Sequence, residues 1–199
     1  PVTSAALKMA EKLKRVKNIP VICVDRDAPT PYIDLYIAFG NREAGRTQAR
    51  RIVEMLTQKF GKPEGEVQIV TGDLSSVVGM ERRDGVLDVL NQYPDIEVVN
   101  IVEATKWIDS VAQEKMMASL KAYGRPDAVV CNFDGATTGT VNALKAQGWL
   151  KKRGEPDHVF IGAIDAATIV FKYMRDGHVA VSYTHLRAHE TRHDLVCRL

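Results

Sequence analysis

Helical and strand patterns alternate along almost the whole chain. Apolar residues at helical spacing predict helices over residues 4–17, 43–59, 78–92, 108–123, 136–147 and 167–175. Short apolar runs between them predict strands over residues 21–24, 35–39, 67–70, 96–102, 128–131 and 159–164. This alternation, with short connections, is typical of a parallel sheet covered by helices. The sequence therefore predicts an α/β fold, with a parallel sheet flanked by helices.

The composition excludes two classes of protein. Apolar residues make up 45% of the 199 residues and charged residues 26%, as is usual for a globular protein. The net charge is only +2, and no basic stripe is interleaved with aromatic residues, so nothing indicates a nucleic-acid partner. No apolar run approaches the roughly 20 residues that a membrane span needs. We expect neither a nucleic-acid-binding nor a membrane-spanning chain.

The last nineteen residues, 181–199, differ from the rest because their apolar periodicity stops. His185, His189, His193 and Cys197 recur every four residues, and on a helix they would present metal ligands along one face. However, the string VSYTHLRAHETRHDLVCRL resembles a translated DNA-library adapter, and such segments are excluded from fold reasoning. We favour the adapter interpretation, expect residues 181–199 to be unstructured or poorly packed, and predict neither a metal site nor a cofactor.

Polar residues follow most of the predicted strands directly. In open parallel sheets, ligands bind beyond the carboxyl ends of the strands, so these residues are candidate contacts. They are Asp25-Arg26-Asp27, Gly72-Asp73, Ala104 to Trp107, Asn132-Phe133-Asp134 and Asp165. Carboxylates accept hydrogen bonds from hydroxyl groups and a guanidinium donates several in a fixed fork, while aromatic rings cover apolar faces. A sugar presents both kinds of surface, so the set fits a sugar or a related polar ligand.

Motifs of common enzymes are missing from the sequence. No glycine-rich dinucleotide or phosphate loop follows a predicted strand, and no GxSxG nucleophile motif is present. The aspartates are spread over separate strand ends rather than paired for acid–base work. Cys23 and Cys131 lie in short apolar runs, where a cysteine is usually a small buried hydrophobic residue. We therefore expect no catalytic activity.

Eight blocks of sequence carry a resemblance to a known family. In order they are NIPVICVDRD, FGNREAG, EGEVQIVTGDLSS with ERRDG, YPDIEVV, PDAVVCNFDGATTGTVNALKAQGW, FIGAIDA and MRDGHVA. Together they resemble the ribose- and galactose-type sugar-binding proteins of bacterial ABC importers, within the periplasmic binding protein type I superfamily. The resemblance covers residues 1–180. It implies a remnant of a first lobe over residues 1–38, a second lobe over residues 39–180, and a non-native tail over 181–199.

The resemblance also implies particular ligand contacts. The positions that match the family's sugar contacts are Asp25, Arg26, Arg82, Trp107, Asp134 and Asp165. Phe133 stands where the family has asparagine, and Asn132 lies one position earlier, which leaves two roles open for Phe133: ring stacking on the ligand in place of a polar contact, or packing in the core. Because neighbouring helix residues point about 100° apart, we expect Arg82 but not Arg83 to face the ligand.

The resemblance leaves two functions open. In the first, the chain belongs to a solute-binding component of an importer, periplasmic or on the outer face of the cell. It would be a monomer that binds a pentose, hexose or polyol and docks on a membrane permease. In the second, it is the effector-binding domain of a cytoplasmic lactose-repressor-type regulator. YPDIEVV and TKWIDS are more similar to the transport branch. An α/β enzyme, a third possibility, would need a catalytic constellation that the sequence does not show.

Overall fold

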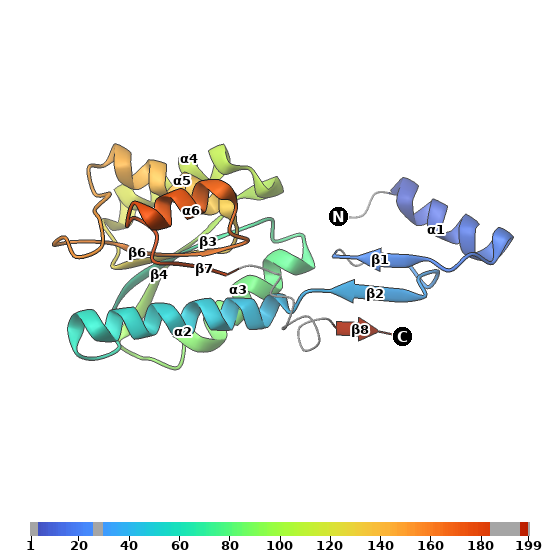
Figure 1. Cartoon of the computed structure of the whole chain (residues 1–199), viewed down its shortest axis with the longest axis horizontal. Coiled ribbons are helices and arrows are strands. Elements are labelled where there is room, and N and C mark those ends of the chain that lie inside the picture. Colours follow the sequence, from blue (N-terminus) through green and yellow to red (C-terminus); the bar gives the residue numbers. More distant parts are fainter. Residues whose placement is uncertain (1–3, 26–29, 184–195, 199) are drawn as a thin grey trace.

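The computed structural model describes residues 4–25, 30–183 and 196–198, and within these ranges the strands form two sheets (Figure 1). The smaller has the order β1-β2-β8, comprising β1 (Ile22–Val24), β2 (Leu35–Ala38) and β8 (Val196–Arg198). The larger has the order β4-β3-β5-β6-β7, comprising β3 (Gly65–Thr71), β4 (Ile96–Glu103), β5 (Ala128–Cys131), β6 (Phe160–Ile164) and β7 (Val181–Tyr183). The segment between β2 and α2 (Asn41–Phe60) passes from one sheet to the other (Figure 1).

Every strand pair of the larger sheet is parallel, with registers such as Val67 opposite Ala128 and Ala128 opposite Phe160. The strands are joined through α3 (Val77–Leu90), α4 (Asp109–Tyr123), α5 (Asp134–Ala146) and α6 (Thr168–Arg175). The predicted α/β fold class is confirmed. No helix in the described part of the chain is both long enough and apolar enough to span a membrane.

The helices cover the larger sheet in two layers, with α2 and α3 on one face and α4, α5 and α6 on the other (Figure 1). Side chains alternate along β5 between these layers. Ala128 and Val130 belong to the core under α2 and α3, whereas Val129 and Cys131 belong to the core under α4 and α5. Because side chains in a strand alternate with period two, a wholly apolar strand is what a sheet covered on both faces requires.

Two glycines let α2 and α3 cross at backbone contact. A Cβ atom at Gly45 would lie 2.2 Å from the Arg82 carbonyl oxygen, and one at Gly85 would lie 1.9 Å from the Arg42 carbonyl oxygen. No side chain fits at either position without a shift of the backbone, so the backbones of the two helices are in direct contact there. The start of α2 is therefore packed tightly against α3.

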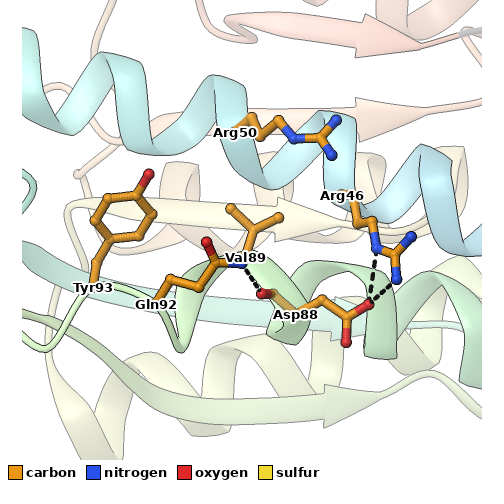
Figure 2. A pocket seen from close by; sticks show the side chains of 6 residues that line it. All are labelled: Arg46, Arg50, Asp88, Val89, Gln92 and Tyr93. Atoms are coloured by element: carbon orange, nitrogen blue, oxygen red, sulfur yellow. Dashed lines mark hydrogen bonds and ion pairs between the residues drawn. The ribbon is translucent and has the colours of Figure 1, made fainter.

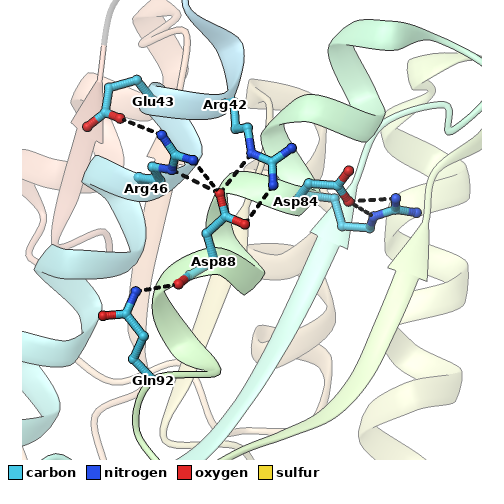
Figure 3. A network of polar contacts seen from close by, with 7 residues as sticks. Arg42, Glu43, Arg46, Asp84, Asp88 and Gln92 are labelled. Carbon is cyan, nitrogen blue, oxygen red and sulfur yellow. Dashed lines mark hydrogen bonds and ion pairs between the residues drawn. The ribbon is translucent and has the colours of Figure 1, made fainter.

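A network of charges braces the same two helices on their solvent side (Figure 3). Asp88 of α3 accepts hydrogen bonds from Arg42 at 2.7 and 2.8 Å and from Arg46 at 2.9 Å. The Arg42 and Arg46 guanidinium groups hold the pKa of Asp88 far below its usual range. Glu43 continues the network to Arg46 and Arg50. Such exposed ion pairs stabilise the folded protein only modestly, typically by under about 1 kcal/mol each.

Helix α1 (Ser4–Lys17) forms where the sequence predicts it, but its apolar stripe is not buried. Met9 is 55% exposed and Val16 is 73% exposed, and on β1 the side chains of Ile22 and Val24 are exposed as well. The helix is held to the smaller sheet by an ion pair between Lys14 and Asp34. Among the described residues no further layer covers this apolar surface, which is why the stripe stays in contact with solvent.

The prediction that residues 181–199 are unstructured or poorly packed is wrong for Val181–Tyr183 and for Val196–Arg198, because both segments form strands. Val181–Tyr183 form β7, which pairs in parallel with β6, and Val181 packs against the core under α2. The Tyr183 carbonyl oxygen accepts a 2.7 Å hydrogen bond from the Asp165 amide. Strand pairing uses backbone groups, which any non-proline residue supplies. Val196–Arg198 also pair, as β8, with β2.

The histidines of the alternative metal site, His185, His189 and His193, lie outside the described residues. Within the described residues no group of three or more potential ligands is placed to hold a metal ion. The origin of the tail in an adapter stays a prediction.

Cys131 offers a test of the packing beneath α5. It is fully buried, its sulfur lies 3.3 Å from the Thr140 hydroxyl, and burial raises its pKa to about 12. In a Cys23→Ser, Cys197→Ser variant we expect the remaining thiol to react with Ellman's reagent at pH 8 roughly a thousandfold more slowly than free cysteine, because the thiolate is the reactive form. Unfolding in urea should restore normal reactivity. Rapid reaction of the folded variant would contradict the observed packing.

Candidate functional site

The carboxyl ends of β3, β5 and β6 bring the predicted contacts to one edge of the larger sheet. Gly72 follows β3, Asn132 to Asp134 follow β5, and Asp165 follows β6. Strand order places β3, β5 and β6 side by side, so these ends are neighbours in space. The candidate site is therefore at the carboxyl edge of the sheet, the edge that the rule for open parallel sheets selects.

Arg82 is the central buried cation of this edge. It lies on α3, is 3% exposed, and donates to groups from three other segments. Its Nε donates to Asn41 Oδ1 at 2.9 Å, and its Nη1 donates to the Asn132 carbonyl oxygen at 2.7 Å. Nη1 and Nη2 each donate to one carboxylate oxygen of Asp165 at 3.1 Å. The guanidinium plane is therefore fixed by contacts from α2 and from the segments that directly follow β5 and β6.

Asp165 faces outward from this pair. Its side chain is 28% exposed, whereas that of Arg82 is 4% exposed. The residue has a positive φ of 92°, a conformation that non-glycine residues rarely adopt and that costs about 1–3 kcal/mol. Such strain is common at binding sites, where surrounding contacts impose it. The arrangement leaves part of a carboxylate on the surface, oriented by a buried arginine and able to accept hydrogen bonds from a ligand.

Arg83 points elsewhere, as the helix geometry predicts. Its Nε and Nη2 donate to Asp84 at 2.8 and 2.6 Å, at the partly exposed surface of α3. Arg82 and Arg83 therefore have different surroundings: one lies within the polar cluster at the sheet edge, and the other pairs with its sequence neighbour.

Trp107 and Phe133 meet beside the same edge. Their ring centroids are 5.1 Å apart and the rings lie edge to face at 78°, a favourable geometry for aromatic pairs. Trp107 ends the short helical turn η1 (Thr105–Trp107) and lies against Gly72, where a Cβ atom would come 2.1 Å from the indole ring. Phe133 is buried at the start of α5. Stacking of either ring on a ligand stays a prediction.

Asp134 is partly buried behind these residues. Its Oδ2 accepts a 2.9 Å hydrogen bond from the Ala167 amide, and Oδ1 has no hydrogen-bond partner among the described residues. Burial raises the pKa of Asp134, and the nearby charge of Asp165 raises it further. Asn132 is fully buried, and neither atom of its side-chain amide has a partner within the described part of the chain. Unsatisfied buried polar groups of this kind are uncommon and often mark functional sites.

The remaining two predicted contacts are not part of this cluster as described. Asp25 follows β1 on the smaller sheet, where its carbonyl oxygen accepts a hydrogen bond from the Tyr36 hydroxyl. Arg26 lies outside the described residues.

A separate groove of about 540 Å³ runs between α2 and α3 (Figure 2). It is lined by Arg46, Arg50, Asp88, Val89, Gln92 and Tyr93. Its charged side chains pair with Asp88 or with Glu43, so their charges are largely satisfied within the protein. The groove belongs to the brace between the two helices rather than to the candidate site.

The periplasmic binding protein domain family matches residues 1–185. The chain belongs to this family. Its fold is that of the periplasmic binding protein type I superfamily, as the resemblance implies.

Relatives of this periplasmic binding protein chain are named for the ligands that they bind. A Rhizobium meliloti protein named as a rhizopine-binding protein is 29% identical over 188 residues, which are 92% of this chain and 57% of the relative. The D-xylose-binding periplasmic protein of Escherichia coli is 27% identical over 153 residues, or 74% of this chain and 44% of the relative.

Among solved structures, the binding protein of the arabinose ABC transporter of Shewanella sp. ANA-3, bound to L-arabinofuranose, is 25% identical with a TM-score of 0.76. That match covers 88% of this chain and 56% of the solved chain. The chain thus spans about half the length of the proteins it matches.

Sequence reasoning missed Asn41, which touches Arg82 directly. Asn41 lies two residues beyond the predicted end of a strand of the other sheet, so the strand-end rule does not select it. The pattern FGNREAG contains a signal, because its second glycine, Gly45, is the close-packing position that brings α2 onto α3.

Proposed function

We propose that this chain is part of a solute-binding component of a bacterial ABC importer, which binds a pentose, hexose or related polyol and catalyses no reaction. The observation that carries the proposal is the Arg82–Asp165 pair. A buried arginine orients a carboxylate that remains 28% exposed at the carboxyl edge of a parallel sheet. Such a carboxylate is preorganised to accept hydroxyl groups.

The aromatic pair at the same edge of the sheet supports a sugar rather than an ion. Trp107 supplies partly exposed ring surface, which the buried Phe133 supports edge to face, and Asp165 supplies hydrogen-bond acceptors. A pyranose or furanose ring has an apolar face and a rim of hydroxyl groups, so it matches both. Direct contact of the ligand with Asp165, Arg82, Trp107, Phe133 and Asp134, and with Asp25 and Arg26 from the other lobe, is part of this proposal.

The relatives favour transport over regulation. They are named for binding rhizopine and D-xylose, and the solved relative belongs to an arabinose ABC transporter. By analogy, the parent protein would act in the periplasm or on the outer face of the cell and dock on a membrane permease. The effector domain of a regulator shares the fold, but these names do not point to it.

Because the chain spans about half the length of its relatives, we expect it to supply one side of a two-lobed site. Ligand contacts in such proteins bridge the two lobes as they close by a hinge motion. The chain alone should therefore bind sugar weakly, with a dissociation constant on the order of millimolar, which corresponds to about 4 kcal/mol.

Trp107 can report this weak binding. The chain has two tryptophans, so a Trp149→Phe variant leaves Trp107 as the sole indole. We expect D-xylose, L-arabinose or D-glucose to change its fluorescence in a saturable way at concentrations of about 1–100 mM. A Trp107→Phe variant, which retains Trp149 in the core under α5, is the matched control and should not respond. Lack of response to all three sugars in the Trp149→Phe variant would refute binding at this edge.

A further inference from the structure

Asn41 occupies the junction between the two sheets. It is the first residue of α2 and follows Phe39 and Gly40, which connect the end of β2 to that helix (Figure 1). Although a helix start is usually at the surface, Asn41 is only 2% exposed. A buried polar side chain needs partners to offset the loss of water.

The nitrogen and the oxygen of the Asn41 side-chain amide form hydrogen bonds with different parts of the molecule. Its Nδ2 donates to the Phe39 carbonyl oxygen at 3.2 Å, and its backbone amide donates to the same oxygen at 2.8 Å. Its Oδ1 accepts the 2.9 Å hydrogen bond from Arg82 Nε. One side chain thus links the connecting segment to the buried arginine of the candidate site.

Helix packing makes this link possible. A Cβ atom at Gly45, one turn after Asn41, would lie 2.2 Å from the Arg82 carbonyl oxygen. The close approach at Gly45 therefore sets the start of α2 directly against the turn of α3 that carries Arg82. A longer residue at position 45 would separate Asn41 from Arg82.

We propose that Asn41 is a positioning residue: it fixes the plane of the Arg82 guanidinium and couples that plane to the segment between the sheets. The two Nη groups of Arg82 are directed at Asp165 and at the Asn132 carbonyl, and the Nε contact with Asn41 supplies the third fixed direction in the plane. Without it, Nε would be a buried donor lacking its acceptor, which drives a side chain to reorient. The effect on ligand binding rests on the function proposed above, whereas the effect on Arg82 itself does not.

The test measures hydrogen exchange at Arg82 Nε by nitrogen-15 NMR, relative to exchange at the Val130 amide in the same sample. Val130 is fully buried in β5, so the ratio corrects for global unfolding. In Asn41→Ala we expect the ratio to rise about tenfold or more, because the Nε–H loses its acceptor. In Asn41→Asp, which keeps an acceptor oxygen, it should stay within about threefold of the original chain.

Gln48→Ala is the matched control. Gln48 is also a buried carboxamide of α2, but its Nε2 donates to the Cys131 carbonyl oxygen at 2.8 Å and not to a site side chain. Its removal should destabilise the chain, yet the ratio of exchange at Arg82 Nε to exchange at the Val130 amide should stay within about threefold of that in the original chain. If Asn41→Ala leaves the ratio unchanged, or if Gln48→Ala raises it equally, Asn41 has no specific positioning role.

Sugar titration of the same variants separates this inference from the proposed function. If the original chain binds sugar, Asn41→Ala should weaken the affinity about three- to tenfold. Asn41→Asp should retain most of the original affinity. If the original chain binds no sugar while Asn41→Ala still releases Arg82, the proposed function fails and the positioning role stands. If the chain binds sugar and Asn41→Ala leaves both affinity and exchange unchanged, the positioning role fails alone.

Discussion

Replacing Arg82 with alanine is expected to lower the free energy of unfolding by about 3–5 kcal/mol, because it removes one partner of a largely buried ion pair. The variant leaves Asn41 Oδ1, the Asn132 carbonyl oxygen and the Asp165 carboxylate without their donor. The loss is a large fraction of the roughly 5–15 kcal/mol by which a typical domain is stable. Urea unfolding followed by circular dichroism measures it.

Arg83→Ala provides the control one residue away. Arg83 pairs with Asp84 at a partly exposed surface, so its removal should change stability by less than about 1 kcal/mol. In the sugar titration, Arg83→Ala should bind as the original chain does. Asp165→Ala should bind about ten- to a hundredfold more weakly if its carboxylate contacts the ligand, since a hydrogen bond to a charged group contributes about 1.5–3 kcal/mol. If Arg82→Ala and Arg83→Ala had the same free energy of unfolding, the Arg82–Asp165 pair would not stabilise the fold.

Gly85→Ala is the second substitution for which we expect a large effect on stability. The sign of that effect distinguishes ordinary helix propensity, which favours alanine, from steric conflict with α2. In an ordinary helix interior, alanine is favoured over glycine by about 0.8–1 kcal/mol. Here the added Cβ atom would lie 1.9 Å from the Arg42 carbonyl oxygen, which is backbone and cannot move without shifting α2. Overpacking of this kind usually costs about 1–3 kcal/mol and occasionally more, so we expect net destabilisation of about 2–3 kcal/mol.

Ser110→Ala, at an exposed position near the start of α4, is a suitable comparison for Gly85→Ala. It adds no atoms against another helix, and its effect on stability should lie within about 0.5 kcal/mol of zero. Thermal unfolding of both variants separates the two cases. An increase in stability for Gly85→Ala would mean that α2 and α3 tolerate a wider spacing than the structure shows.

The fold was predictable because its signals are local. Strand β5 is apolar at every position, and helices such as α4 have apolar residues at a regular helical spacing. Each element can therefore be recognised from its own sequence. The order of the strands, β4-β3-β5-β6-β7, was not predicted, because it depends on which strands pair and not on the pattern of any single element. The predicted ends differ from the observed ones by a few residues, as for α2, which begins at Asn41 rather than at residue 43.

The site was predictable only in part, because half of it depends on contacts distant in sequence. Asp165 and Phe133 are found by their position after strands, without knowledge of the packing. Asn41 and Gln48 act through helix α2, and their roles depend on how closely that helix lies against α3 and β5. The tail was misjudged for a similar reason: Val181 joins the sheet through backbone pairing with Gly162, which periodicity does not reveal.

The contacts of Arg82 also bear on the order of events in folding. Its partners lie 41, 50 and 83 positions away along the chain. Closing loops of that length costs entropy before any contact is gained, so such pairings tend to form late. Helices α3 and α5 can appear early from local interactions, but the edge that carries the candidate site exists only once α2 has docked and β5 and β6 have paired. The guanidinium of Arg82 is thus a marker of the completed native state.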